Sequence, residues 1–90
     1  MRQPSYSGQF KRDVQQARRR GKDMERLKEL MGLLIEGKPL PARYLNHPLK
    51  GMWRGFFDAH IEPDWVLIYK ATDSAVRFER TGRHVDLFKG

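Results

Sequence analysis

Cysteine is absent from this 90-residue sequence. The absence excludes disulfides, cysteine-ligated zinc and thiol nucleophiles. A secreted chain of this size is usually cross-linked by disulfides, so we expect a cytoplasmic protein. Because so short a chain can bury only one small core, we also expect residues 1–90 to form a single domain.

Long hydrophobic segments are absent as well. No apolar run approaches the ~18–20 residues that a membrane-spanning helix requires. The first residues, Met-Arg-Gln-Pro-Ser-Tyr, contain no apolar stretch of the kind found in signal peptides. We therefore expect no secretion signal and no membrane partner.

Positive charge is abundant and unevenly placed. The net charge is +7, and residues 1–30 hold nine Lys or Arg against four Asp or Glu. Residues 61–90 hold five of each sign. A basic chain favours polyanionic partners such as nucleic acid, an acidic membrane surface or an acidic protein. The plain alternative is a basic surface that only keeps the protein soluble.

Two amphipathic helices are predicted in the first half, after a short strand at residues 3–6. Ser7 is a favourable N-cap, and the apolar residues behind it recur at helical spacing towards Gly21, a typical C-cap residue. Asp23 caps a second helix, whose apolar stripe ends at Gly37. The short link between the helices predicts an antiparallel hairpin.

In the second half of the chain, the spacing of the hydrophobic residues changes from a helical period to a period of two residues. Residues 38–48 contain three prolines, and we interpret them as a loop. Alternation over 53–61 predicts a strand, and the apolar run 65–69 predicts a central strand covered on both faces. Residues 75–81 return as a further strand, and 83–88 form a short tail, either a strand or a single turn.

These elements, in the order β-α-α-β-β-β, predict an α+β fold. Two N-terminal helices should pack on one face of a small, mostly antiparallel four-stranded sheet. The alternation places Trp53 and Phe57 on the helix-covered face, and Asp58 and His60 on the other. Since no helix remains to cover that second face, a substrate could lie there.

Three histidines and one aspartate are the main candidates for chemistry. In an antiparallel meander the turn that contains Asp64 lies next to the end of the strand that carries His60. The last strand returns to the same edge and brings His84 there, and His47 precedes the first long strand. Imidazole and carboxylate groups can supply the base and acid for RNA cleavage by internal 2′-OH attack without a metal ion. Each histidine alone is more often a packed or surface residue.

Aromatic and cationic side chains flank the same edge. Trp65 and Phe88 could stack on an unpaired base, although core packing is the more usual role of a large aromatic residue. Arg80 and Arg83 could bind phosphate beside His84, and solvated cations are the equally weighted alternative.

Other catalytic classes have weaker support. Three histidines and an aspartate could ligate zinc, but the His60 to Asp64 spacing crosses a proline turn and lacks the helical spacing of zinc hydrolases. No serine lies in a nucleophile-elbow motif. We therefore expect no metal and no cofactor.

Several blocks of the sequence resemble the YafQ branch of the RelE-class toxins. The resemblance covers nearly the whole chain. It rests on His47-Pro48-Leu49-Lys50-Gly51-x-Trp53, on Asp58-Ala59-His60-Ile61-x-Pro63-Asp64-Trp65-x-Leu67-Ile68-Tyr69, on Arg80-Thr81-Gly82-x-His84-x-x-Leu87-Phe88 and on the opening Tyr6-Ser7-Gly8-Gln9-x-x-x-Asp13-Val14.

The resemblance implies a RelE-like fold and a ribosome-dependent endoribonuclease that cuts mRNA in the A site of the 70S ribosome. It implies acid–base work by His47, His60, Asp64 and His84, with His84 the most critical. Cleavage would leave a 2′,3′-cyclic or 3′-phosphate and a 5′-hydroxyl. The implied partner is a DinJ-like antitoxin, and operator DNA would be bound only through the toxin–antitoxin complex.

The resemblance also implies substrate contacts from Trp65, Arg80 and Phe88, to which we add Arg83 and Lys50. Many relatives carry a polar residue where this chain has Phe57, which here fits the apolar alternation and indicates core packing. The main rival hypothesis is a non-catalytic basic subunit, binding nucleic acid or acting as a co-repressor, with structural histidines.

Overall fold

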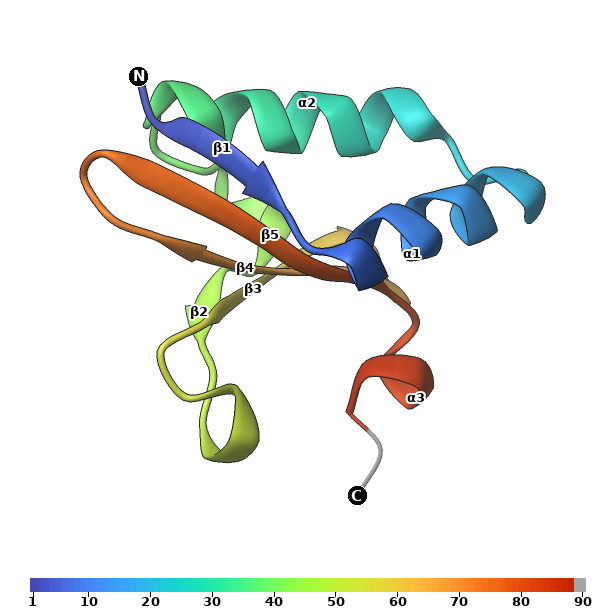
Figure 1. Ribbon diagram of the computed structural model, residues 1–90. Helices are drawn as coiled ribbons and strands as arrows, with labels where there is room; N and C mark the ends of the chain where they lie inside the picture. Colours follow the sequence, from blue (N-terminus) through green and yellow to red (C-terminus); the bar gives the residue numbers. More distant parts are fainter. Residues whose placement is uncertain (89–90) are drawn as a thin grey trace.

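A computed structural model describes residues 1–88 and shows a mixed sheet with helices on both sides (Figure 1). The sheet has five strands in the order β1-β5-β4-β3-β2. Its central part, β3 to β5, is the predicted antiparallel meander, and β1 pairs with β5 in parallel. The strands are β1 (Gln3–Tyr6), β2 (His47–Pro48), β3 (Phe57–Glu62), β4 (Trp65–Ala71) and β5 (Ala75–Gly82).

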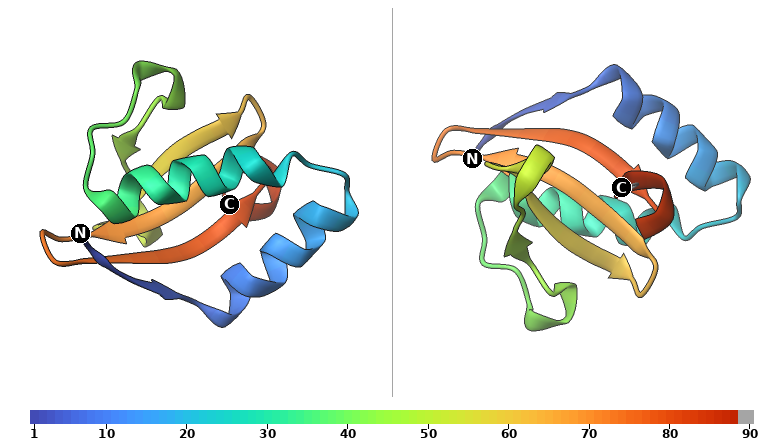
Figure 2. Two further views of the ribbon diagram at one scale, coloured as in Figure 1. Left: turned by 90° about the horizontal axis from the view of Figure 1, so that it is seen from above. Right: turned by 90° about the horizontal axis from the view of Figure 1, so that it is seen from below.

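Both predicted helices form, and their ends follow the predicted capping rules. The hydroxyl of Ser7 accepts a hydrogen bond from the Phe10 N–H at the start of α1 (Gly8–Arg19). The Asp23 carboxylate caps α2 (Met24–Glu36), which ends at Gly37 with a φ of 75°. Figure 2 shows that α2 lies across the sheet, whereas α1 runs beside the edge formed by β1 and β5, and the two helices diverge from their short link.

The two faces of the sheet carry separate apolar clusters, because successive β4 side chains point to opposite sides. Trp65, Leu67 and Tyr69 join the large core beneath α1 and α2. Val66 and Ile68 face the other way and pack with side chains from the loop before β3 and from the C-terminal turn. The prediction of a central strand buried on both faces is confirmed.

The sequence-based count of four strands is wrong, and so is the start of the first long strand. The missed strand, β2, has only two residues, and one is a proline in a segment with no apolar period. The strand predicted from Trp53 begins at Phe57, since residues 51–53 form the 3₁₀ turn η2 (Gly51–Trp53). Trp53 therefore packs on the face opposite the helices, whereas Phe57 lies against the helix-covered core as predicted.

The chain after β5 forms one helical turn, α3 (His84–Leu87), on the face opposite α1 and α2 (Figure 1). A second 3₁₀ turn, η1 (Ala42–Tyr44), precedes β2. The β3–β4 turn and the β5–α3 junction meet at one edge of the sheet, as the Val66–Gly82 pairing shows. In residues 1–88 no helix has the length and apolar character to span a bilayer.

Candidate active site

A buried carboxylate, Asp58, lies at the centre of the histidine cluster. Asp58 is in β3, and the strand register places His47 of β2 directly opposite. The Nδ1 atom of His47 lies 2.9 Å from Asp58 Oδ1, and Nε2 of His60 lies 3.9 Å from Asp58 Oδ2. The charges of His47, His60 and His84 all act on Asp58. The three imidazoles are therefore grouped around one anion.

The ring of His47 is held by its neighbour in the loop. Nδ1 is 3.0 Å from the carbonyl oxygen of Leu45 with hydrogen-bond geometry, whereas Asp58 Oδ1 has no hydrogen-bond partner among residues 1–88. Leu45 adopts a left-handed backbone conformation with a φ of 48°, which turns its carbonyl towards the ring. Because a carbonyl can only accept, Nδ1 must carry the hydrogen. In the neutral ring Nε2 is therefore the unprotonated nitrogen.

His84 is held in a corresponding way by Asp64. One carboxylate oxygen, Asp64 Oδ1, lies 3.2 Å from the His84 backbone nitrogen and 3.2 Å from its Nδ1. The backbone N–H of His84, followed by its side chain, lowers the pKa of Asp64 below its ordinary value near 3.8. An ionised carboxylate only accepts hydrogen bonds, so Nδ1 of His84 donates and Nε2 faces away from Asp64.

The rings of His60, His84 and Phe88 are close together at this edge. The centroids of His60 and His84 are 5.2 Å apart, with the rings edge to face. The Phe88 ring lies 5.6 Å from that of His84. His84 and His47 are roughly half exposed, with 47% and 57% of their side chains accessible, whereas His60 is largely buried at 16%. Two imidazoles thus face solvent beside a more buried third.

Burial sets the protonation behaviour of Asp58. Desolvation raises its pKa above 3.8, and the positive potential of His47, His60 and His84 offsets part of this shift. Among residues 1–88 no group donates a hydrogen bond to its Oδ1. The charges of the three imidazoles therefore stabilise the Asp58 carboxylate where a hydrogen bond to Oδ1 is missing.

The predicted convergence of His47, His60, Asp64 and His84 is confirmed, and their catalytic roles stay predictions. Asp58 was missed as a site residue. The period-two alternation had placed it on the same face as His60, and this could have identified it. Its burial was not visible, because β2 and the preceding loop, which cover it, carry no periodic signal.

The expectation that Trp65 stacks on a base is wrong. Its side chain is only 1% exposed, and its indole N–H donates to Thr81 Oγ1 at 3.0 Å inside the helix-covered core. Strand alternation puts it on the face opposite His60 and Asp58, because these residues pair with Val66 and Ile68, which alternate with Trp65 and Leu67 along β4. Lys50, by contrast, is exposed in the loop after β2.

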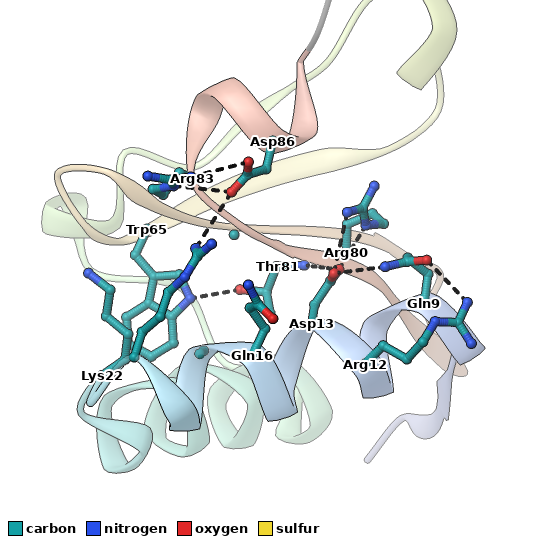
Figure 3. Close-up of a pocket in the computed structure, with 13 residues that line it drawn as sticks. Gln9, Arg12, Asp13, Gln16, Lys22, Trp65, Arg80, Thr81, Arg83 and Asp86 are labelled. Carbon is teal, nitrogen blue, oxygen red and sulfur yellow. Dashed lines mark hydrogen bonds and ion pairs between the residues drawn. The ribbon is translucent and has the colours of Figure 1, made fainter.

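Arg80 and Arg83, which were predicted to bind phosphate beside His84, form ion pairs within the protein, and their phosphate-binding role stays a prediction. Both line a groove between α1 and the end of β5, here called the basic groove (Figure 3). The guanidinium of Arg80 pairs with Asp13 of α1, with Nε 2.7 Å from Oδ2. Arg83 pairs with Asp86 at 3.1 Å. Arg80 thus contacts α1, whereas Arg83 contacts α3.

The cluster is organised around a carboxylate and not around a shared cation position. Within residues 1–88 no group of three or more His, Asp or Glu side chains is arranged to hold a metal ion. The arrangement can hold and move protons, because two half-exposed imidazoles are bound through Nδ1 and keep Nε2 for proton transfer.

Comparison with known proteins gives a consistent family. Residues 2–89 match the family model described as the bacterial toxin YafQ of type II toxin–antitoxin systems. The chain is 61% identical to the mRNA interferase toxin YafQ of Escherichia coli strain K12 over 84 residues, which are 92% of this chain and 91% of that protein.

Solved structures agree with the sequence match. The crystal structure of YafQ from E. coli strain BL21(DE3) superposes with a TM-score of 0.94 at 57% identity, over 98% of this chain and 99% of that one. The E. coli DinJ–YafQ toxin–antitoxin complex gives a TM-score of 0.91 at 59% identity, over 97% of each chain. This chain belongs to the YafQ family of bacterial type II toxin–antitoxin toxins.

Proposed function

We propose that this protein cleaves mRNA by acid–base catalysis without a metal ion and that a DinJ-like antitoxin neutralises it. The observation that carries the proposal is the grouping of three imidazoles around Asp58, two of them half exposed and bound through Nδ1, which leaves Nε2 for the substrate. The name of the E. coli relative, mRNA interferase, and the structure of its complex with DinJ support it.

The proposed reaction is an in-line attack of the ribose 2′-oxygen on the adjacent phosphorus. His47 accepts the 2′-hydroxyl proton at Nε2, and a bond forms between the 2′-oxygen and phosphorus. The bond from phosphorus to the 5′-oxygen breaks, and protonated His84 gives its Nε2 proton to that oxygen. The products are a 2′,3′-cyclic phosphate and a 5′-hydroxyl.

Three further residues support this proton transfer. Asp64 orients His84 by accepting from its backbone and its ring. Asp58 keeps His47 and His60 in place by charge, and His60 lies against the His84 ring where the phosphate would bind. Phe88, next to His84, provides a surface on which the base of the cleaved nucleotide can stack.

We place the substrate in the A site of the 70S ribosome in the cytoplasm. His47 and His84 are roughly half exposed to solvent, and a site so exposed needs another body to position its substrate. The ribosome supplies that constraint. We also propose that the protein binds operator DNA only as part of the toxin–antitoxin complex.

Mapping of cleavage sites on translated mRNA tests the proposal. Primer extension with wild-type protein should show 5′ ends within codons that occupy the A site, and His84→Ala should remove them. Val85→Ala is the matched control, since Val85 lies in the same turn and its side chain points to solvent. Both variants should still bind the antitoxin.

Two results would contradict the proposal. Normal cutting by His84→Ala would exclude the assigned acid. Harmless expression of the wild-type protein, with no new mRNA ends, would favour the non-catalytic subunit instead.

A further inference from the structure

The basic groove, drawn in Figure 3, contains Arg83, the residue that precedes His84 of the histidine cluster. Its volume is about 350 Å³. Five of its lining residues are cations and two are carboxylates, which leaves three positive charges in excess. The cations are Arg12, Arg20, Lys22, Arg80 and Arg83, and the carboxylates are Asp13 and Asp86.

The two carboxylates hold some of these cations in place. Asp13 receives two hydrogen bonds from Arg80, at 2.7 and 3.3 Å, so this pair is neutral. Asp86 lies between two guanidiniums, with Arg83 at 3.1 Å and Arg20 at 3.6 Å. One carboxylate therefore positions two guanidiniums and neutralises only one of them, which leaves an ordered excess charge with unused N–H donors.

The remaining cations are not neutralised within the groove. Among residues 1–88 Arg12 has no carboxylate at ion-pair distance, and its guanidinium donates to the Gln9 amide oxygen at 3.1 Å. Lys22 shares Glu62, which lies outside the groove, with Arg26, at 3.3 and 3.6 Å. The groove thus offers guanidinium and ammonium groups to a ligand with several negative charges.

The groove and the histidine cluster meet at the β5–α3 turn. Arg83 lines the groove, and the next residue, His84, belongs to the cluster. A polymer held at the histidines can therefore continue over this turn and into the groove without leaving the protein surface.

We propose that the basic groove binds the phosphodiester backbone of the RNA strand that continues from the cleaved bond. This inference rests on the proposed function, which makes RNA the polymer at the histidines. Guanidinium groups bind phosphate oxygens in a bidentate manner, and non-sequence-specific backbone binding needs only an ordered row of cations. Asp13 and Asp86 hold the guanidiniums of this row in fixed positions through their ion pairs.

The experiment measures binding rather than cleavage. A twelve-nucleotide RNA with 2′-O-methyl groups throughout has no 2′-hydroxyl and cannot be cut. Its affinity, measured by fluorescence anisotropy over a series of salt concentrations, gives the number of phosphate contacts, with a slope of about 0.7 per contact on a log–log scale. Binding of a trinucleotide of the same chemistry, followed by NMR at the histidine resonances, reports on the cleavage site alone.

The test variant is Arg12→Gln combined with Arg20→Gln. It should reduce the salt slope for the twelve-nucleotide RNA by about 1.4, the equivalent of two contacts, and leave trinucleotide binding unchanged. The control is Lys28→Gln combined with Arg77→Gln, which removes the same charge at exposed positions outside the groove and should keep the wild-type slope. Circular dichroism checks that both variants are folded.

Two outcomes would overturn the inference. Equal slopes for the test and control variants would show that only net charge matters. Unchanged RNA binding with weaker sedimentation on 70S ribosomes would show that the groove contacts the ribosome and not the substrate strand. Because the binding assay needs no cleavage, failure of the proposed reaction would be seen separately, as absence of cutting by the wild-type protein.

Discussion

One oxygen of Asp64 accepts hydrogen bonds from both the backbone N–H and the ring Nδ1 of His84, each at 3.2 Å. The carboxylate thereby fixes the first residue of α3 and the orientation of its imidazole together. Asp64 lies in the turn between β3 and β4, and His84 begins α3 20 residues later. Their contact fixes the ring to which we assign the role of proton donor.

Asp64→Asn should slow cleavage while keeping the position of α3. The amide oxygen can still accept from the His84 backbone, but the negative charge beside the ring is lost. We expect a single-turnover rate roughly tenfold lower, a part of the roughly 10²–10⁴-fold that general acid catalysis contributes. The pH dependence of that rate should shift as well. A rate equal to that of wild type would show that Asp64 only caps the helix.

Asp58→Asn should change how stability depends on pH. The pKa of Asp58 is raised in the folded protein, mainly by burial, so the folded state binds the proton more tightly than the unfolded state. The wild-type free energy of unfolding should therefore fall as pH rises from the ordinary carboxyl pKa near 3.8 through the raised one. The variant should lack this component, and urea unfolding at several pH values measures it. A wild-type carboxyl titration at or below 3.8, seen by NMR, would refute the assignment.

Trp65→Phe should affect stability and leave the cleavage rate of the folded protein unchanged. The substitution removes the buried hydrogen bond to Thr81, which we expect to cost about 1–2 kcal/mol. Phe88→Ala is the complementary variant, because Phe88 lies beside His84 and should mainly lower the cleavage rate. Chemical denaturation measures the effect on stability, and single-turnover cleavage measures the effect on rate. If Trp65→Phe lowered the cleavage rate and left the stability unchanged, Trp65 would be a substrate contact after all.

Leu45→Asn should stabilise the protein by about 0.5–1 kcal/mol. Leu45 has a φ of 48° and a 62% exposed side chain, so it bears the strain of a left-handed conformation without a matching gain from burial. Asparagine adopts this conformation more readily and leaves the carbonyl that orients His47 in place. Thermal and urea unfolding test the gain. A loss of stability would mean that the exposed leucine makes a contact that offsets its backbone strain.

Local rules determined much of this fold. Ser7, Asp23 and Gly37 set the helix ends because capping depends on a few adjacent residues. The apolar run of β4 and the turns on either side specified the meander, and the meander was enough to bring His60, Asp64 and His84 to one edge.

Contacts between distant residues were decided only by the tertiary structure. The pairing of β1 with β5 and the ion pair of Asp13 with Arg80 join parts of the chain about 70 residues apart, and neither leaves a periodic signal in the sequence. The burial of Asp58 depends on a two-residue strand that pairs only because its loop folds back. The direction of Arg80 depends on the register shift between β4 and β5 and on its ion pair with Asp13, and side-chain type alone does not encode this.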